Sequence, residues 1–169
     1  MAVEEQTQYD QTVTLHGTTP LRVGQELAVP DRLISKLGFW LSKLASPTGN
    51  ITFTIRAEND DEALASKVLA DASTLTTEAA YYEVTFDAPV QINETVRMCV
   101  EYGGGDTNNR VYAWEINADV KASEFMVFYY SAVWYDSAAT DLAYIYTYEG
   151  DEIAGNAGVA AALVAANMI

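Results

Sequence analysis

The sequence has little of the side-chain chemistry that nucleophilic catalysis uses. Cys99 is the only cysteine and His16 the only histidine among 169 residues. A single cysteine excludes an intrachain disulfide, and a cysteine nucleophile needs a histidine partner. His16 has no acidic or cysteine neighbour at a suggestive spacing, so we expect a solvated loop histidine. Cys99 lies in an apolar run, where we expect a small buried side chain.

Basic residues are scarce as well, because nine Lys and Arg stand against 24 Asp and Glu, a formal charge of −15. A nucleic-acid surface needs clustered basic side chains, so the composition argues against nucleic acid as a partner. Acidic and amide residues gather at 58–62 and 106–109, with Asp136 and Asp141 further on. Calcium needs several oxygen ligands. None of these segments has the spacing of an EF-hand or repeat-type calcium loop, so we expect solvated loops and no cofactor.

Long apolar runs are absent too. The N-terminus has no basic segment followed by an apolar one, so we expect no signal peptide and synthesis in the cytoplasm. The Ala-rich segment 153–169 is uncharged but interrupted by Gly155, Asn156 and Gly158. It is shorter than the about 20 apolar residues of a membrane span. Such a segment requires a surface to pack on, and the candidate assembly contacts are Val159, Leu163, Val164, Met168 and Ile169.

What the sequence does have is alternation with a period of two. Ile51, Phe53, Ile55 and Ala57 fall on one face and polar residues on the other, which predicts a strand with one buried and one solvated face. Leu33–Leu44 alternates as well, and the turn residues between the two segments predict a hairpin. Turn signals separate further predicted strands at Thr12–Leu15, Gln25–Val29, Tyr81–Phe86, Thr95–Tyr102, Val111–Ile116, Phe125–Tyr130 and Leu142–Tyr148.

About eight strands without a strand–helix rhythm predict an all-β fold, an antiparallel β-sandwich or jelly roll. We expect the domain over 21–149, an N-terminal arm over 1–20 and the apolar tail over 150–169. Residues 60–77 leave two alternatives open, a helix built from good helix formers or a short strand through Leu64–Val68.

Aromatic residues concentrate late in the chain. Tyr144, Tyr146 and Tyr148 share one face of a predicted strand. This row either lines the core or is exposed, and an exposed row would suit sugar stacking or a protein interface. The candidate glycan or partner contacts are Trp134, Tyr135, Tyr144, Tyr146 and Tyr148.

Two segments, Gly24–Pro30 and Leu33–Ile55, carry a resemblance to a known family; the second contains the turn Lys-x-x-Ser-Pro-Thr-Gly-Asn. Over roughly residues 21–148 the chain resembles the choice-of-anchor R type of β-sandwich domain. That family is similar to carbohydrate-binding jelly rolls and occurs in phage, archaeal and surface proteins. The resemblance implies the fold and supplies no catalytic residues. The chain departs from the family in its leaderless start and its Ala-rich tail, which favours a particle over a cell wall.

We therefore expect a non-enzymatic structural protein of a virion, such as a capsid decoration, spike or tail component, that assembles through its N-terminal arm and its tail. Its partners would be other copies of the chain and neighbouring particle proteins. A carbohydrate-binding module that uses exposed aromatics is the alternative, with glycans as partners. A hydrolase ranks last, because among 24 acidic residues a carboxylate pair can always be nominated.

Overall fold

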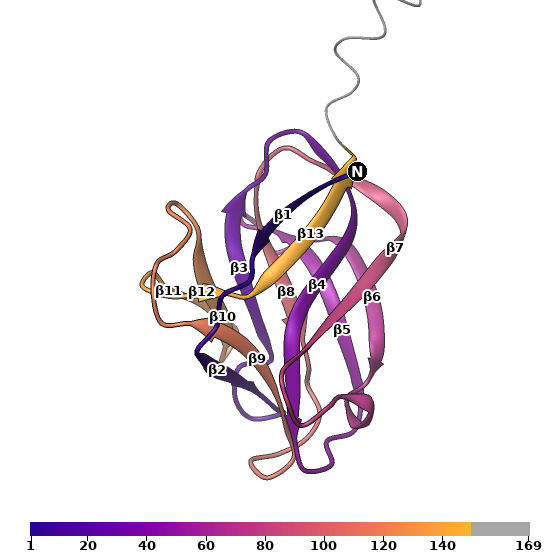
Figure 1. Cartoon of the computed structure of the whole chain (residues 1–169), viewed down its shortest axis with the longest axis vertical. Coiled ribbons are helices and arrows are strands. Elements are labelled where there is room, and N and C mark those ends of the chain that lie inside the picture. Colours follow the sequence, from indigo (N-terminus) through magenta and orange to yellow (C-terminus); the bar gives the residue numbers. More distant parts are fainter. Residues whose placement is uncertain (150–169) are drawn as a thin grey trace, which may run out of the picture.

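The computed structural model describes residues 1–149, which contain no α-helix and form two antiparallel sheets packed face to face (Figure 1). The fold is thus all-β and sandwich-like, as predicted. The seven-stranded sheet has the order β1 (Ala2–Gln6), β13 (Tyr144–Glu149), β4 (Arg32–Leu44), β9 (Arg110–Ile116) and β12 (Asp141–Leu142), with β7 (Ala80–Ile92) beside β4 and β2 (Gln11–Leu15) beside β9. The six-stranded sheet has the order β11 (Val133–Ser137), β10 (Phe125–Tyr130), β3 (Arg22–Ala28), β8 (Thr95–Glu101), β5 (Asn50–Ala57) and β6 (Ala63–Asp71).

The core lies between the sheets and is built from alternate side chains of their strands. Ile51, Phe53 and Ile55 of β5 are fully buried, which confirms the predicted alternation. Phe53 meets Phe39 of β4 edge to face, with ring centroids 5.0 Å apart, so the two sheets interlock there.

The predicted hairpin of Leu33–Leu44 with Ile51–Ala57 is wrong. β4 belongs to the seven-stranded sheet and β5 to the six-stranded sheet, so the turn between them carries the chain from one sheet to the other. Gly49 in this turn has φ 106°, a conformation that suits glycine. Alternation reports which face of a strand is buried, but not whether the next strand lies beside it or opposite it.

The segment 1–20, expected as an arm, contributes β1 and β2 to the seven-stranded sheet, where β1 pairs with β13 and β2 with β9. In 60–77 the strand alternative is confirmed, because β6 pairs with β5 and a single 3₁₀ turn (Ala72–Thr74) follows. The described residues form thirteen strands, more than expected, partly because Leu142–Tyr148 divides into β12 and β13.

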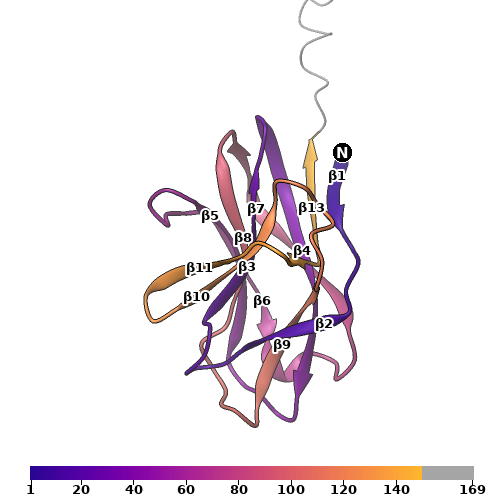
Figure 2. The same cartoon turned by 90° about the vertical axis from the view of Figure 1, so that its left-hand side faces the viewer.

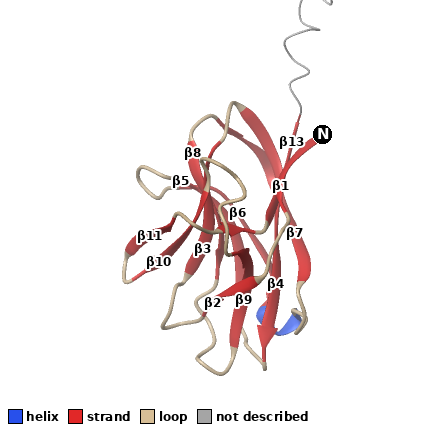
Figure 3. Ribbon diagram, turned by 60° about the vertical axis from the view of Figure 1, so that its left-hand side comes forward, coloured by secondary structure: helices blue, strands red, loops and turns tan. Residues whose placement is uncertain are grey.

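β10 and β11 form a hairpin that projects from the sandwich (Figures 2 and 3). Its two-residue turn consists of Ser131 and Ala132, with φ 51° and 63°. Two successive residues with positive φ give the hairpin turn whose twist matches that of the flanking strands.

Candidate functional site

The predicted tyrosine row belongs to the core. Tyr144 and Tyr146 are 0% and 1% exposed, and Tyr148 is half-buried beneath the Arg32 guanidinium, 4.1 Å from the ring centroid. An exposed contact role is therefore wrong for Tyr144 and Tyr146, because β13 turns this face toward the other sheet. The core alternative for the row is confirmed.

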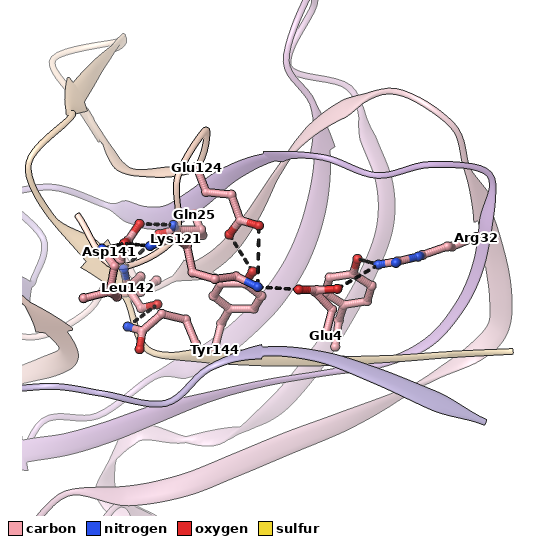
Figure 4. Close-up of polar contacts among 11 residues, drawn as sticks. Glu4, Gln25, Arg32, Lys121, Glu124, Asp141, Leu142 and Tyr144 are labelled. Carbon is pink, nitrogen blue, oxygen red and sulfur yellow. Dashed lines mark hydrogen bonds and ion pairs between the residues drawn. The ribbon is translucent and has the colours of Figure 1, made fainter. Parts of the chain in front are cut away.

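A network of charged side chains surrounds Tyr144 (Figure 4). The Tyr144 hydroxyl donates to Glu124 Oε2 at 2.6 Å, and Lys121 lies between Glu124 and Glu4. Arg32 joins the same network through Glu4 at 3.3 Å. Burial raises the pKa of Glu124, and the Tyr144 hydrogen bond and the Lys121 charge offset this only in part. Burial also acts on Glu4, but Lys121 and Arg32 outweigh it and lower its pKa. The network pairs its charges internally.

Asp141, one of the acidic residues considered for calcium, is fully buried and bonded to the protein on both carboxylate oxygens (Figure 4). Its Oδ1 accepts from Gln25 Nε2 at 2.6 Å. Its Oδ2 accepts from the backbone N–H groups of Val120 and Lys121 at 2.7 and 2.9 Å. The Gln25 side-chain oxygen in turn accepts from the backbone N–H of Leu142 at 2.8 Å. Asp141 therefore ties the loop before Glu124 to both sheets.

The outer face of the six-stranded sheet carries a second charged group, here called the arginine cluster. Arg56 Nε lies 2.6 Å from Glu101 Oε1, and Arg22 NH1 lies 2.8 Å from Asp61 Oδ2. Beneath the guanidinium groups lies Cys99, fully buried as expected, and burial raises the pKa of its thiol. The members of the cluster are Arg22, Arg56, Arg97, Glu26, Glu58, Asp61 and Glu101.

Trp134, a candidate glycan contact, packs on the arginine cluster. Its Nε1 donates to Asp61 Oδ1 at 3.1 Å, and the Arg97 guanidinium carbon lies 4.8 Å from its ring centroid. The indole thus anchors the projecting hairpin to the β5–β6 loop. Tyr135, the next residue, lies on the opposite face of the hairpin, 43% exposed and stacked on Phe128.

That opposite face of the hairpin is apolar. The cross-strand pairs Phe128–Tyr135 and Tyr130–Val133 stand next to each other on it. Tyr130 and Val133 are 45% and 50% exposed. We call these four residues the hairpin patch. Grouped exposed apolar side chains on a projecting element are typical of an interaction surface.

A second exposed group lies on the outer face of the seven-stranded sheet and was not singled out from the sequence. Tyr81 of β7 contacts Trp40 of β4 with ring centroids 4.8 Å apart. Tyr9, between β1 and β2, lies 6.1 Å from Trp40 and 5.2 Å from Trp114 of β9. Tyr9 and Tyr81 are each 37% exposed, and both tryptophans are half-buried. We call these four residues the aromatic strip.

The alternation of Leu33–Leu44 indicates that one member of the strip, Trp40, lies on the solvated face of its strand. Trp40 stands between Phe39 and Leu41, both fully buried, so its ring points outward with Lys36 and Gly38. A tryptophan on the solvated face of a strand is unusual enough to mark a surface of interest.

The only histidine, His16, is buried and not solvated as expected. His16 is 2% exposed, so the prediction of a solvated loop residue is wrong. The backbone N–H of Thr18 points to its Nδ1 at 3.4 Å. The adjacent Gly17 packs against the backbone carbonyls of the glycine loop 103–105.

The acidic and amide segment 106–109 forms a turn closed by the Asp106 side chain. Asp106 Oδ1 accepts from the N–H groups of Asn108 and Asn109 at 2.7 and 3.0 Å, and these hydrogen bonds lower the pKa of Asp106. Among residues 1–149, no group of three or more His, Cys, Asp or Glu side chains is placed to hold a metal ion. A shallow depression of about 290 Å³ between β6 and β7 is lined by Leu64, Phe86 and Val90 with their neighbours.

A scan of the chain against protein-family models finds no match, and a search of the curated proteins finds none either. None of the helical turns within residues 1–149 is long and apolar enough to cross a membrane. The candidate functional sites of the described residues are therefore two surfaces, the hairpin patch and the aromatic strip.

Proposed function

We propose that this chain is a non-enzymatic structural protein that assembles with further copies of itself and with neighbouring proteins of a particle. The observation that carries the proposal is the division of the β10–β11 hairpin into one anchored and one exposed apolar face. Trp134 holds the first face to Asp61 and Arg97, and the second face presents the hairpin patch.

An anchored hairpin is well suited to docking. Association is weakened by the entropy of ordering mobile segments, and a hairpin held by Trp134 is ordered before a partner arrives. A few side chains supply most of the binding energy of a protein interface, and tyrosine is among the types enriched there. Tyr130 and Tyr135 are such side chains, with Val133 beside them, and all three are at least 43% exposed.

The charge of the chain favours uncharged contact surfaces. Two copies that each carry a formal charge of −15 repel one another. The electrostatic repulsion is smallest where uncharged, apolar surfaces meet. A stable interface buries about 800 Å² on each partner, more than four side chains supply. The proposal therefore includes the uncharged segment 153–169, whose candidate contacts Val159, Leu163, Val164, Met168 and Ile169 lie outside the described residues.

Three finer expectations from the sequence belong to the same proposal. They are the location in a virion, the jelly-roll order of the connections, and membership of the choice-of-anchor R type of domain. The two antiparallel sheets are compatible with the second and third of these expectations.

The test is the mass of the full-length protein in solution, measured by light scattering and sedimentation over a range of concentrations. We expect a defined oligomer, and a Tyr130→Ser/Val133→Ser double variant should dissociate at roughly 30-fold higher concentration because about 2 kcal/mol of apolar burial is lost. Val68→Ser on β6 is the matched control, since Val68 is 49% exposed and Val133 50%. Deletion of residues 150–169 tests the tail separately.

Equal masses for the wild type and the double variant would contradict the role of the hairpin patch. A wild type that stays monomeric at every concentration would overturn assembly through copies of the chain.

A further inference from the structure

We propose that the aromatic strip binds a neutral, soluble polysaccharide chain, with its exposed rings against the apolar faces of the sugar units. This inference is independent of assembly, because the strip and the hairpin patch lie on different sheets. It assigns carbohydrate recognition to residues other than the five named from the sequence.

The rings of the strip form a continuous series. Adjacent members of the strip, in the order Tyr81, Trp40, Tyr9 and Trp114, have centroids 4.8, 6.1 and 5.2 Å apart. These are contact distances between neighbouring aromatic rings, so the four rings form one continuous surface. Ring faces attract the C–H groups of a pyranose through their negative electrostatic potential, and each ring also removes apolar surface from water. A sugar chain that lies along this surface can therefore contact more than one ring.

The sheet beneath Tyr81 is shaped to hold this ring. A Cβ placed on Gly38 would lie 2.3 Å from the Tyr81 hydroxyl oxygen, so the ring lies across the glycine. The Tyr81 hydroxyl donates to Glu83 at 3.0 Å, and Lys36 donates to the same carboxylate at 2.8 Å. Burial, with the bond to Glu83, raises the pKa of the Tyr81 hydroxyl. The ring is thus ordered before any ligand binds.

Polar groups stand beside the strip, as sugar hydroxyls require. Lys36 and Glu83 offer a donor and an acceptor next to Tyr81. On the other side, Ser42 Oγ accepts from Trp114 Nε1 at 2.9 Å, which fixes the orientation of the indole. These groups provide hydrogen-bond partners without a deep pocket.

The geometry and the charge together narrow the ligand class. The planes of neighbouring rings are inclined by 41–61°, so the strip is twisted and does not match a flat crystalline surface. A flexible single chain can follow such a surface. The formal charge of −15 repels uronate and sulfate polymers, which leaves neutral chains.

The test is affinity electrophoresis of the full chain in gels containing mixed-linkage β-glucan, arabinoxylan, glucomannan or soluble starch, with affinities then measured by quenching of tryptophan fluorescence. We expect retardation by at least one of these polymers. Tyr81→Ala should weaken binding at least tenfold, and Tyr81→Phe, which keeps the ring, should retain most of it. Leu21→Ala is the control, because Leu21 is 40% exposed and lies outside both the aromatic strip and the hairpin patch, and it should bind as the wild type.

Gly38→Ala gives a second test that leaves every aromatic residue in place. The new methyl group displaces the Tyr81 ring, so affinity should fall at least fivefold while thermal unfolding confirms a folded protein. Absence of retardation in all four gels would overturn the proposal, as would retention that Tyr81→Ala leaves unchanged. Stronger binding to polygalacturonate or to crystalline cellulose would overturn the assigned ligand class.

Discussion

The outer faces of the two sheets differ in what their side chains contact. On the six-stranded sheet, the arginine cluster pairs guanidinium groups with carboxylates, and the side chains of Arg56 and Glu101 are only 14% and 20% exposed. On the seven-stranded sheet, Tyr9 and Tyr81 of the aromatic strip keep 37% of their surface in contact with solvent. On the six-stranded sheet the polar groups already bond to one another, so a ligand would have to replace those bonds. On the seven-stranded sheet, aromatic side chains are exposed and free to contact a ligand.

The projecting hairpin explains much of this difference. Trp134 reaches from β11 to Asp61 and Arg97, which covers the centre of the arginine cluster. Thr54, predicted on the solvated face of β5, is only 2% exposed and donates to Glu101 at 2.6 Å. Charges withdrawn from water in this way must be paired, because an isolated one costs several kcal/mol, on the order of 3–5.

The largest effect is therefore expected from breaking the arginine cluster. Arg56→Met removes the guanidinium that bonds Glu101 and leaves a partly buried carboxylate without its closest cation. We expect the free energy of unfolding to fall by about 2–3 kcal/mol in urea denaturation. Lys67→Met is the matched control, since its pair with Asp87 is exposed and should contribute less than about 0.5 kcal/mol. Equal losses in the two variants would show that the cluster is an ordinary surface feature.

A smaller effect is expected from releasing the hairpin. Trp134→Phe keeps an aromatic ring but removes the hydrogen bond to Asp61. We expect a loss of about 1–2 kcal/mol and faster amide hydrogen exchange over Phe125–Ser137, with exchange in β4 and β9 unchanged. Tyr135→Phe, on the exposed face of the same strand, should leave exchange as in the wild type. Uniform acceleration across both sheets would mean that Trp134 supports the whole fold and not the hairpin alone.

The faces of individual strands could be predicted from the sequence. Alternation placed Ile51, Phe53 and Ile55 in the core, and the apolar run around Cys99 indicated burial. β11 was missed because its turn, Ser131 and Ala132, contains none of the Asn, Asp or Gly residues that mark a two-residue hairpin turn.

Strand pairing could not be predicted, and both candidate surfaces depend on it. The aromatic strip combines Tyr9, Trp40, Tyr81 and Trp114 from four separate segments, which only the tertiary arrangement brings together. For the same reason, the sequence could not decide whether the tyrosine row of β13 lies in the core or on the surface. The inward face of β13 packs on the opposite sheet, and that packing depends on contacts between residues far apart in the sequence.

The smallest expected effect concerns a carboxylate of the seven-stranded sheet that lacks the pairing found in the arginine cluster. Glu115 is 6% exposed, and Gln11 Nε2 donates to its Oε1 at 2.9 Å. Its Oε2 has no hydrogen-bond partner among the described residues. Burial raises the pKa of Glu115, the Asp10 charge raises it further, and the Gln11 bond counteracts them only in part.

A raised pKa means that the folded state holds the Glu115 proton more tightly than the unfolded state does. Stability is therefore lost as pH rises from the ordinary value of 4.5 through the raised pKa, and Glu115 costs stability at neutral pH. Glu115→Gln should gain about 1 kcal/mol at neutral pH and almost nothing below the ordinary value, as measured by urea denaturation across this range. Glu94→Gln, at an exposed position, removes one negative charge in the same way and controls for the change in net charge. A gain that persists unchanged in acid, or one matched by Glu94→Gln, would show that overall charge repulsion and not the unpaired oxygen is responsible.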